Sequence, residues 1–309
     1  MQALVKYHGL RDWKLRLPYH DSISVNTTSM KTVATITDKE RGGVFVDGTA
    51  NGSANVRLAG VLEGLAPGSA VESFRIDSKN IPAGRAKGIG YSSSAGAALT
   101  LLCHRLLVGG EPDMRELSRR ARVFAASASR SMVGGFSRLY AGKTDEEAYS
   151  ERFADGREMD LRMVIVPLPS RVRTEDAHKE VLTSPFFDAR VASAQKRCDE
   201  MEKAIRGNDL ERLGVLAERD TLELHSLTMT GESRLIIMTE DSIRIISKVR
   251  QLRSEGLDAY FSLQTGPSVF INTSERHEKK VFAAIARLGY RAYFSKVGGE
   301  ARIVAAPKG

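Results

Sequence analysis

The stretch best suited to chemistry is rich in glycine and serine and covers residues 82–96, with the sequence PAGRAKGIGYSSSAG. An apolar run, AALTLLCHRLL, follows at once and predicts a buried helix. Backbone N–H groups ahead of a helix have no partner within it, so they can hold an anion. A Walker loop is excluded because Gly-Lys-Ser/Thr is missing, and no strand–GxGxxG–helix pattern is present. An anion cradle and an ordinary flexible loop with a serine N-cap both fit this composition.

A second group of polar side chains lies near the N-terminus. Lys6, Tyr7, His8, Arg11 and Lys14 fall within ten residues and combine hydrogen-bond donors with an aromatic pair. Such a density of donors favours an anionic ligand. A solvated basic loop produces the same pattern, and both interpretations stay open.

A single arginine, Arg130, stands in a segment of small residues, AASASRSM. Ser127, Ser129 and Ser131 flank it, and two glycines follow. The planar guanidinium suits a carboxylate or a phosphate. An arginine that neutralises the dipole at the end of a helix fits the same residues.

Composition narrows the class of protein. A chain of 309 residues predicts two domains or one large bilobed unit. The net charge of +8 favours acidic partners, but no lysine and arginine block of five or more occurs, so we expect phosphorylated small molecules rather than nucleic acid. Cys103 and Cys198 lie far apart and outside metal-ligand spacing, which indicates reduced thiols. Without a signal peptide or a long apolar run, we expect a cytoplasmic protein with no membrane segment.

The first half mixes short strands and helices. Alternating patterns and turn residues predict strands at residues 22–26, 32–37, 44–46 and 71–76. Glycines 42 and 43 are expected to form the turn of a hairpin between the strands at 32–37 and 44–46. Helical periodicity covers residues 114–122. A buried strand at residues 161–167 follows, and we place the domain boundary between residues 165 and 166.

The second half begins with a predicted loop at residues 169–180, which carries Arg171, Arg173 and His178. Helices are predicted at residues 189–206, 209–228, 239–255 and 275–288, and strands at 259–263, 268–272, 291–294 and 301–305. His225 lies on the apolar side of the second helix and is expected to be structural. Because strands and helices mix without strict βαβ alternation, the predicted class is α+β.

Seven short motifs, in this order, resemble the mevalonate-pathway decarboxylases of the GHMP kinase superfamily. They are KYHG (6–9), LPYHDSISV (17–25), GIGYSSSAG (88–96), SASRSMVGGF (127–136), TEDAH (174–178), LTMTG (227–231) and TGPSVFIN (265–272). The resemblance spans nearly the whole chain. KYHG and TEDAH are most similar to the archaeal phosphomevalonate decarboxylase branch.

The resemblance implies a two-lobed GHMP fold, residues 1–165 and 166–309, with the active site in the cleft between the lobes. Family members phosphorylate the C3 hydroxyl of a phosphorylated mevalonate from ATP and then expel that phosphate together with CO2. By this likeness Arg130 holds the carboxylate, and residues 88–96 form the phosphate loop. Lys6, Tyr7 and His8 line the pocket, and Arg171, Arg173 and His178 lie on the 5-phosphate side.

Three departures from the family pattern bear on the reaction. Gln264 stands where ATP-dependent members have the aspartate beside the C3 hydroxyl, and a neutral amide cannot accept that proton. The residues Gly84 to Lys87 are inserted ahead of the loop, where nucleotide phosphates need room. Ala125 and Ala126 replace two serines, and Val172 replaces a lysine.

We therefore interpret the chain as an ATP-independent decarboxylase that converts mevalonate 3,5-bisphosphate to isopentenyl phosphate, with no metal or nucleotide. Arg130, Lys6 and Lys87 are the expected catalytic residues. The expected substrate-binding residues are Tyr7, His8, Arg85, Ser92, Ser93, Ser94, Ser127, Arg171, Arg173, His178 and Gln264.

Three alternatives remain. The first is an ATP- and Mg²⁺-dependent decarboxylase of phosphomevalonate or diphosphomevalonate that tolerates Gln264. The second is a mevalonate-type kinase of the same fold, which would release ADP without CO2. The third is a non-catalytic anion-binding protein. Dimers are common in the family, so a homodimer is possible.

Overall fold

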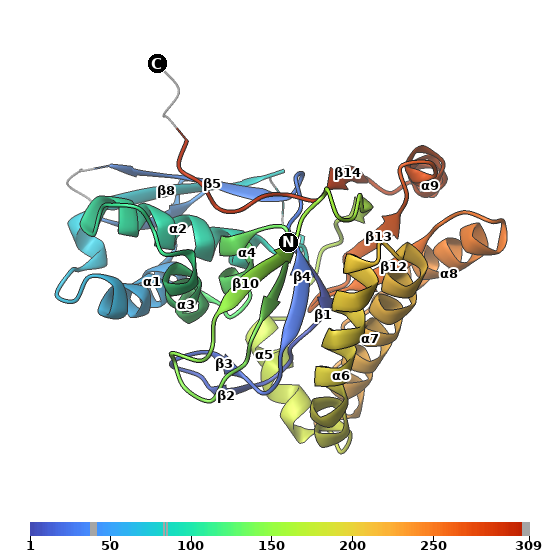
Figure 1. Cartoon of the computed structure of the whole chain (residues 1–309), viewed down its shortest axis with the longest axis horizontal. Helices are drawn as coiled ribbons and strands as arrows, with labels where there is room; N and C mark the ends of the chain where they lie inside the picture. The colour runs from blue at the N-terminus through green and yellow to red at the C-terminus, as the bar shows by residue number, and fades with distance from the viewer. Residues whose placement is uncertain (38–41, 83, 85, 305–309) are drawn as a thin grey trace.

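The computed structural model describes residues 1–37, 42–82, 84 and 86–304, and Figure 1 shows their arrangement. The described residues form three four-stranded sheets and one two-stranded ribbon, with helices packed against them. Strands and helices alternate irregularly along the chain, and most strand pairs are antiparallel. The α+β class predicted from the sequence is therefore confirmed.

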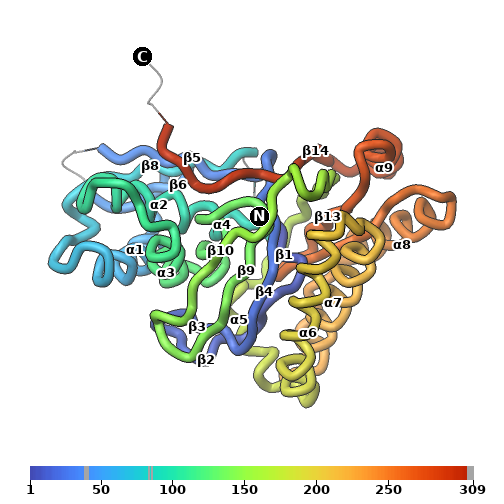
Figure 2. Tube along the Cα trace, viewed as in Figure 1, coloured from blue at the N-terminus to red at the C-terminus, as the bar shows by residue number. Residues whose placement is uncertain are grey.

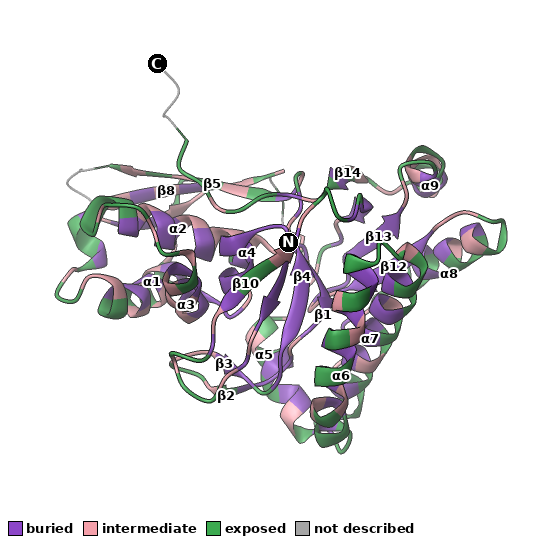
Figure 3. Cartoon of the chain, in the orientation of Figure 1, coloured by how far each residue is buried: buried purple, intermediate pink, exposed green. Residues whose placement is uncertain are grey.

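The central sheet carries the N-terminus, and only its edge strand has exposed residues. Its strands, in spatial order, are β1 (Gln2–Val5), β4 (Ser22–Val25), β9 (Phe136–Leu139) and β10 (Ser150–Ala154). Every residue of β1, β4 and β9 is buried, and Figure 3 shows β4 in purple. The ribbon of β2 (Leu10–Asp12) and β3 (Leu17–Pro18) lies between β1 and β4 in the chain.

Two long helices from the second half cover one face of this sheet. They are α6 (Phe187–Arg206) and α7 (Leu210–Thr230), and Figure 2 shows them beside β1 and β4. Leu4, Ile23 and Phe136 share one core with Met201 and Leu213. The helices bury mainly apolar side chains against the sheet, as amphipathic helices do, but they also bury the charged side chains of Arg190, Arg197 and Asp220. Parts of the chain about 200 residues apart thus close over the first strand.

The remaining N-terminal residues form a sheet packed against helices. The strands, in order, are β5 (Lys31–Thr37), β8 (Arg75–Ile81), β6 (Gly43–Val46) and β7 (Thr49–Ala50). The helices are α1 (Gly52–Leu65), α2 (Tyr91–Leu107), α3 (Met114–Phe124) and α4 (Ala128–Val133). Small residues such as Gly96 and Ala128 bring α2 and α4 close together, because a Cβ on Gly96 would lie 2.7 Å from the Ala128 Cβ.

The third sheet belongs to the second half. Its order is β12 (Tyr260–Leu263), β13 (Val269–Thr273), β11 (Arg162–Val166) and β14 (Tyr293–Lys296), all antiparallel. The helices α8 (Glu240–Ser254) and α9 (Glu278–Ala286) supply Ile245, Val249 and Val281 to its core. Thr239 and Ser242 close a capping box at the start of α8.

Strand β11 contains residue 165, where the predicted domain boundary falls, and it pairs with β13 and β14 of the second half. The chain therefore passes from the central sheet to the third sheet between β10 and β11. Within the described ranges, no helix is long and apolar enough to cross a membrane.

Several sequence predictions were wrong in detail. The expected hairpin between residues 32–37 and 44–46 is absent, because β5 pairs with β8 whereas β6 pairs with β7 and, in parallel, with β8. Residues 71–73 form a short 3₁₀ helix, and the strand starts only at Arg75. The apolar alternation was read correctly, but strand pairing depends on contacts distant in sequence.

Two further corrections concern the second half. The predicted loop at residues 169–180 contains the helix α5 (Thr174–Glu180), which has Glu175 and Asp176 in its first turn and His178 and Lys179 in its last. These charges suit the helix dipole. Residues 301–304 are not a strand, and residue 305 lies outside the described residues.

Close packing of α7 on β12 gives a stability prediction. A Cβ on Gly214 would overlap the ring of Tyr260, so Gly214→Ala should lower the free energy of unfolding by about 1–3 kcal/mol. Gly52 has open space around it at the start of α1, and Gly52→Ala should change stability by less than about 1 kcal/mol. Urea unfolding of both variants tests this. Equal stabilities would contradict the packing of α7 on β12.

Candidate active site

The candidate site gathers side chains from both halves of the chain around the segment after β1. Lys6, Tyr7 and His8 follow β1 directly, Arg130 comes from α4, and His178 comes from α5. Lys6, His8 and Arg130 are buried, with 3%, 1% and 1% of their surface exposed. The sequence predicted all five as site residues, and the fold brings them together.

Arg130 is a buried cation without a carboxylate partner among the described residues. Its Nε and Nη1 atoms are buried and make no hydrogen bond to any described residue, and its guanidinium lies 5.5 Å from the centre of the Tyr7 ring. Burial lowers the pKa of Arg130 to about 10, so the side chain stays charged at neutral pH. A buried, unpaired charge is strongly unfavourable unless a ligand compensates it. Arg130 is therefore suited to bind an anion.

Lys6 is paired differently, within a buried ion cluster. Its Nζ donates to Asp220 Oδ2 at 3.2 Å and to Thr221 Oγ1 at 3.3 Å. Burial lowers the pKa of Lys6 to about 8, against the opposing effect of Asp220. Lys6 thus lies close to the boundary between its charged and neutral forms in the physiological range.

Asp220 is shared by several cations. Arg190 Nη2 lies 2.6 Å and Arg197 Nη1 lies 3.4 Å from its Oδ1 atom. Although burial alone would raise it, the pKa of Asp220 is lowered to about 2 by Arg190, Lys6 and Arg197. This carboxylate is occupied by cations and cannot act as a general base near pH 7.

Aromatic rings form one wall of the site. Tyr7 stacks on His178 with 5.3 Å between ring centres and 4° between ring planes, and His8 meets His178 edge-on at 4.7 Å. His178 Nδ1 accepts a hydrogen bond from the Gly9 N–H at 3.1 Å. Burial lowers the pKa of His178 to about 4 and that of His8 well below its usual value. Both rings are neutral at pH 7, so the positive charge of the site comes from Lys6 and the arginines.

His225 is buried on α7, close to the backbone of Gln264. Burial lowers its pKa to about 4. The prediction of a structural rather than ligating histidine remains open.

Gln264 joins three parts of the fold. Its Oε1 accepts from Ala3 N at 3.2 Å, and its Nε2 donates to Met1 O at 3.1 Å and to Gly88 O at 3.2 Å. An aspartate here could not donate to these two carbonyls. The amide therefore serves as a cross-link between β1, the glycine loop and the end of β12.

The glycine loop is held in a conformation that only glycine readily adopts. Gly88 and Gly90 have φ of +78° and +85°, and a Cβ on Gly88 would lie 3.0 Å from Gly266 Cα. Gly90 caps α2 without a side-chain hydrogen bond. The N–H groups at the start of α2 are thus available to an anion such as a phosphate.

The serines after Gly90 differ in their surroundings. Ser93 Oγ donates to Ser127 Oγ at 2.5 Å, and Ser94 Oγ lies 2.6 Å from Thr32 Oγ1. Ser92 is exposed. Ser93 and Ser127 connect the loop helix to α4, which carries Arg130.

The inserted segment ahead of the glycine loop carries two cations, Arg85 and Lys87. The Lys87 side chain is exposed, whereas its backbone is fixed by N–H donation to Leu168 O at 3.2 Å and by acceptance from Ser268 Oγ at 2.5 Å. Arg85 lies outside the described residues. The role predicted for both in phosphate binding stays a prediction.

Sequence reasoning missed an arginine cluster next to the aromatic wall. Arg57 Nη2 lies 2.8 Å and Arg16 Nη2 3.5 Å from Glu175 Oε1, and Arg173 Nη2 lies 3.8 Å from its Oε2. The predicted residues Arg171 and Arg173 are exposed. Arg16 and Arg57 were missed because they lie 41 residues apart and belong to no common motif.

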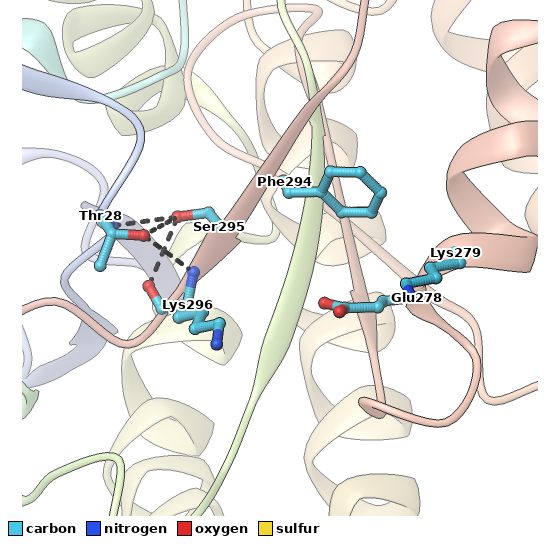
Figure 4. A pocket seen from close by; sticks show the side chains of 6 residues that line it. All are labelled: Thr28, Glu278, Lys279, Phe294, Ser295 and Lys296. Carbon is cyan, nitrogen blue, oxygen red and sulfur yellow. Dashed lines mark hydrogen bonds between the residues drawn. The ribbon is translucent and has the colours of Figure 1, made fainter.

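Two surface cavities are lined by other residues. Figure 4 shows one of about 540 Å³, in which Ser295 Oγ lies 3.3 Å from Thr28 Oγ1. Its lining residues are Thr28, Glu278, Lys279, Phe294, Ser295 and Lys296. The other, of about 520 Å³, includes Arg11, Asp21 and Lys143. The described part of the chain contains no group of three or more His, Cys, Asp or Glu side chains placed to hold a metal ion.

Comparison with known proteins identifies the chain. Residues 1–150 match the diphosphomevalonate decarboxylase-like N-terminal domain, and residues 172–297 match the mevalonate 5-diphosphate decarboxylase C-terminal domain. The phosphomevalonate decarboxylase of Haloferax volcanii is 35% identical over 98% of this chain and 95% of the relative. The chain belongs to this decarboxylase family. It is thus an enzyme of the mevalonate pathway, and the resemblance noted in the sequence is confirmed.

Other relatives of this decarboxylase differ in the reaction that their names describe. The mevalonate 3,5-bisphosphate decarboxylase of Thermoplasma acidophilum is 26% identical over 89% of this chain and 69% of the relative. The solved mevalonate diphosphate decarboxylase of Enterococcus faecalis is 24% identical, with a TM-score of 0.86 over 96% of this chain and 94% of that chain. This likeness confirms the GHMP-type fold.

The pKa of Lys6 gives a prediction for the pH dependence of this decarboxylase. Because burial sets that pKa near 8, the side chain is protonated below pH 8 and loses its charge above it. If the charge stabilises the leaving phosphate, kcat/KM should fall about tenfold per pH unit above pH 8. Lys6→Arg keeps the charge and should remove this decline, at lower overall activity. A decline unchanged in Lys6→Arg would exclude Lys6 as its source.

Proposed function

We propose that this decarboxylase acts on mevalonate 3,5-bisphosphate and needs no nucleotide. The C1–C2 bond breaks and its electron pair forms the C2–C3 double bond, while the C3–O bond breaks and phosphate leaves with the C3–O pair. The products are CO2, inorganic phosphate and isopentenyl phosphate. No proton must be taken from a C3 hydroxyl, because that oxygen already carries phosphate.

The environment of Gln264 is the observation that carries this proposal. The three hydrogen bonds of its side-chain amide go to the backbone, and an amide cannot remove a proton. Asp220 cannot replace it, because cations hold its pKa at about 2. Phosphoryl transfer to a tertiary alcohol would lack a base, whereas elimination of an existing phosphate needs none.

The other groups suit elimination. Arg130, a buried cation with free donors, would hold the carboxylate in place until it leaves as CO2. Negative charge then moves toward the phosphate on C3, where Lys6 and the N–H groups at the start of α2 would stabilise it. The neutral rings of Tyr7 and His8 would limit access of water.

Some groups of the site could also bind a nucleotide. The free N–H groups at the start of α2 fit phosphate oxygens of ATP as well as those of a substrate. The Haloferax relative, named phosphomevalonate decarboxylase, is also more similar to this chain than the Thermoplasma relative, at 35% against 26% identity. A decarboxylase that uses ATP on phosphomevalonate is therefore the second candidate.

Substrate choice separates the two candidates. We expect purified enzyme to release CO2 and isopentenyl phosphate from mevalonate 3,5-bisphosphate in the absence of nucleotide. Arg130→Met should lower kcat/KM by roughly 100-fold or more, the usual loss when a charge-stabilising donor is removed. Arg157→Gln, which alters an exposed ion pair with Asp155, should leave the rate unchanged. Release of CO2 only from phosphomevalonate and only with ATP would favour the second candidate.

A further inference from the structure

Three arginines from different parts of the chain converge on one carboxylate, Glu175. Arg16 follows β2, Arg57 lies on α1, and Arg173 precedes α5. Their guanidinium nitrogens lie 3.5, 2.8 and 3.8 Å from the Glu175 carboxylate. The side chains of Arg16, Arg57 and Glu175 are 16%, 23% and 32% exposed, so solvent or a ligand can reach them. We name this group the Glu175 cluster.

The Glu175 cluster adjoins the aromatic wall of the active site. Glu175 and His178 lie one turn apart on α5, and His178 stacks on Tyr7. The charge of Arg16 acts on the pKa of both Tyr7 and His178. Because Tyr7 is also the neighbour of Arg130, its ring connects the carboxylate site to the Glu175 cluster.

The charge of the cluster suits a single phosphate group. Three guanidinium groups and one carboxylate sum to +2. A phosphate monoester carries about −1.5 to −2 at neutral pH, and a second phosphoryl group adds about one further negative charge. With Glu175 present, a monophosphate neutralises the cluster, whereas a diphosphate leaves an excess negative charge.

The position of Glu175 between the arginines also disfavours a diphosphate. Its Oε1 atom is shared by Arg16 and Arg57, and so it already fills one anion position between them. A monophosphate can use the remaining guanidinium donors. The terminal phosphoryl group of a diphosphate would need the same donors as Glu175 and would lie beside a like charge, which is costly.

We propose that Glu175 is a specificity-determining residue that restricts the substrate to a monophosphate at C5 and rejects the diphosphate. This inference rests on one part of the proposed function, namely that the substrate extends from Arg130 past Tyr7 to the arginines of the Glu175 cluster. It holds whether or not the enzyme uses ATP.

Equilibrium binding tests the inference without turnover. Phosphomevalonate and diphosphomevalonate lack the 3-phosphate, so neither reacts when nucleotide is absent, and their dissociation constants can be measured by calorimetry. We expect the wild-type enzyme to bind phosphomevalonate more tightly. Glu175→Gln and Glu175→Ala should each shift the ratio of the two affinities toward diphosphomevalonate by about tenfold or more.

Asp176→Asn is the matched control, because Asp176 is the exposed carboxylate next in sequence on the same helix. It should leave the ratio unchanged, and thermal melting should show that all variants are folded. A ratio that stays within twofold of wild type in both Glu175 variants would overturn the inference. An equal shift in Asp176→Asn, or an equal loss of both ligands in the Glu175 variants, would overturn it as well.

Discussion

Three hydrogen bonds from one amide hold the site together. Gln264 links the first strand through Met1 and Ala3 to the glycine loop through Gly88. The same loop is fixed from the other side, where Gly88 and Gly266 approach backbone to backbone and Ser268 binds the Lys87 carbonyl. The position of the free N–H groups at the start of α2 therefore depends on this cross-link. An amide suits it because it both accepts and donates.

The cations of the site fall into two classes. Lys6, Arg190 and Arg197 share Asp220. Both arginines also pair with Glu223, so two carboxylates offset most of the charge of these three cations. Arg130 has no such partner among the described residues, so no carboxylate offsets the unfavourable free energy of burying its charge. A folded protein tolerates such an unpaired charge when a ligand supplies the counterion. This contrast separates a ligand-binding arginine from the structural ones more clearly than burial alone.

Much of the fold and part of the site could be predicted from the sequence. The long helices were found within about three residues of their ends because their apolar periodicity extends over four or more turns. Arg130 and Gln264 were located through short motifs in a fixed order. The helix α5 was missed because about two turns of mainly polar residues give no periodic signal.

Contacts between distant residues could not be predicted. Lys6 and Asp220 are separated by 214 positions, and Arg16, Arg57 and Glu175 meet only after β2, α1 and α5 have packed. Nothing local in the sequence marks Asp220 as the partner of Lys6. Such pairs follow from the covering of β1 by α7, which is a property of the whole fold.

The central claim is that the enzyme starts from a phosphate already on C3. Incubation with phosphomevalonate and ATP labelled in its γ-phosphate measures this most directly. The account predicts that no labelled mevalonate bisphosphate forms and that labelled phosphate is released no faster than in the absence of enzyme. Labelled phosphate released in equal amount with CO2 would show that the enzyme phosphorylates C3 itself, and would contradict the account.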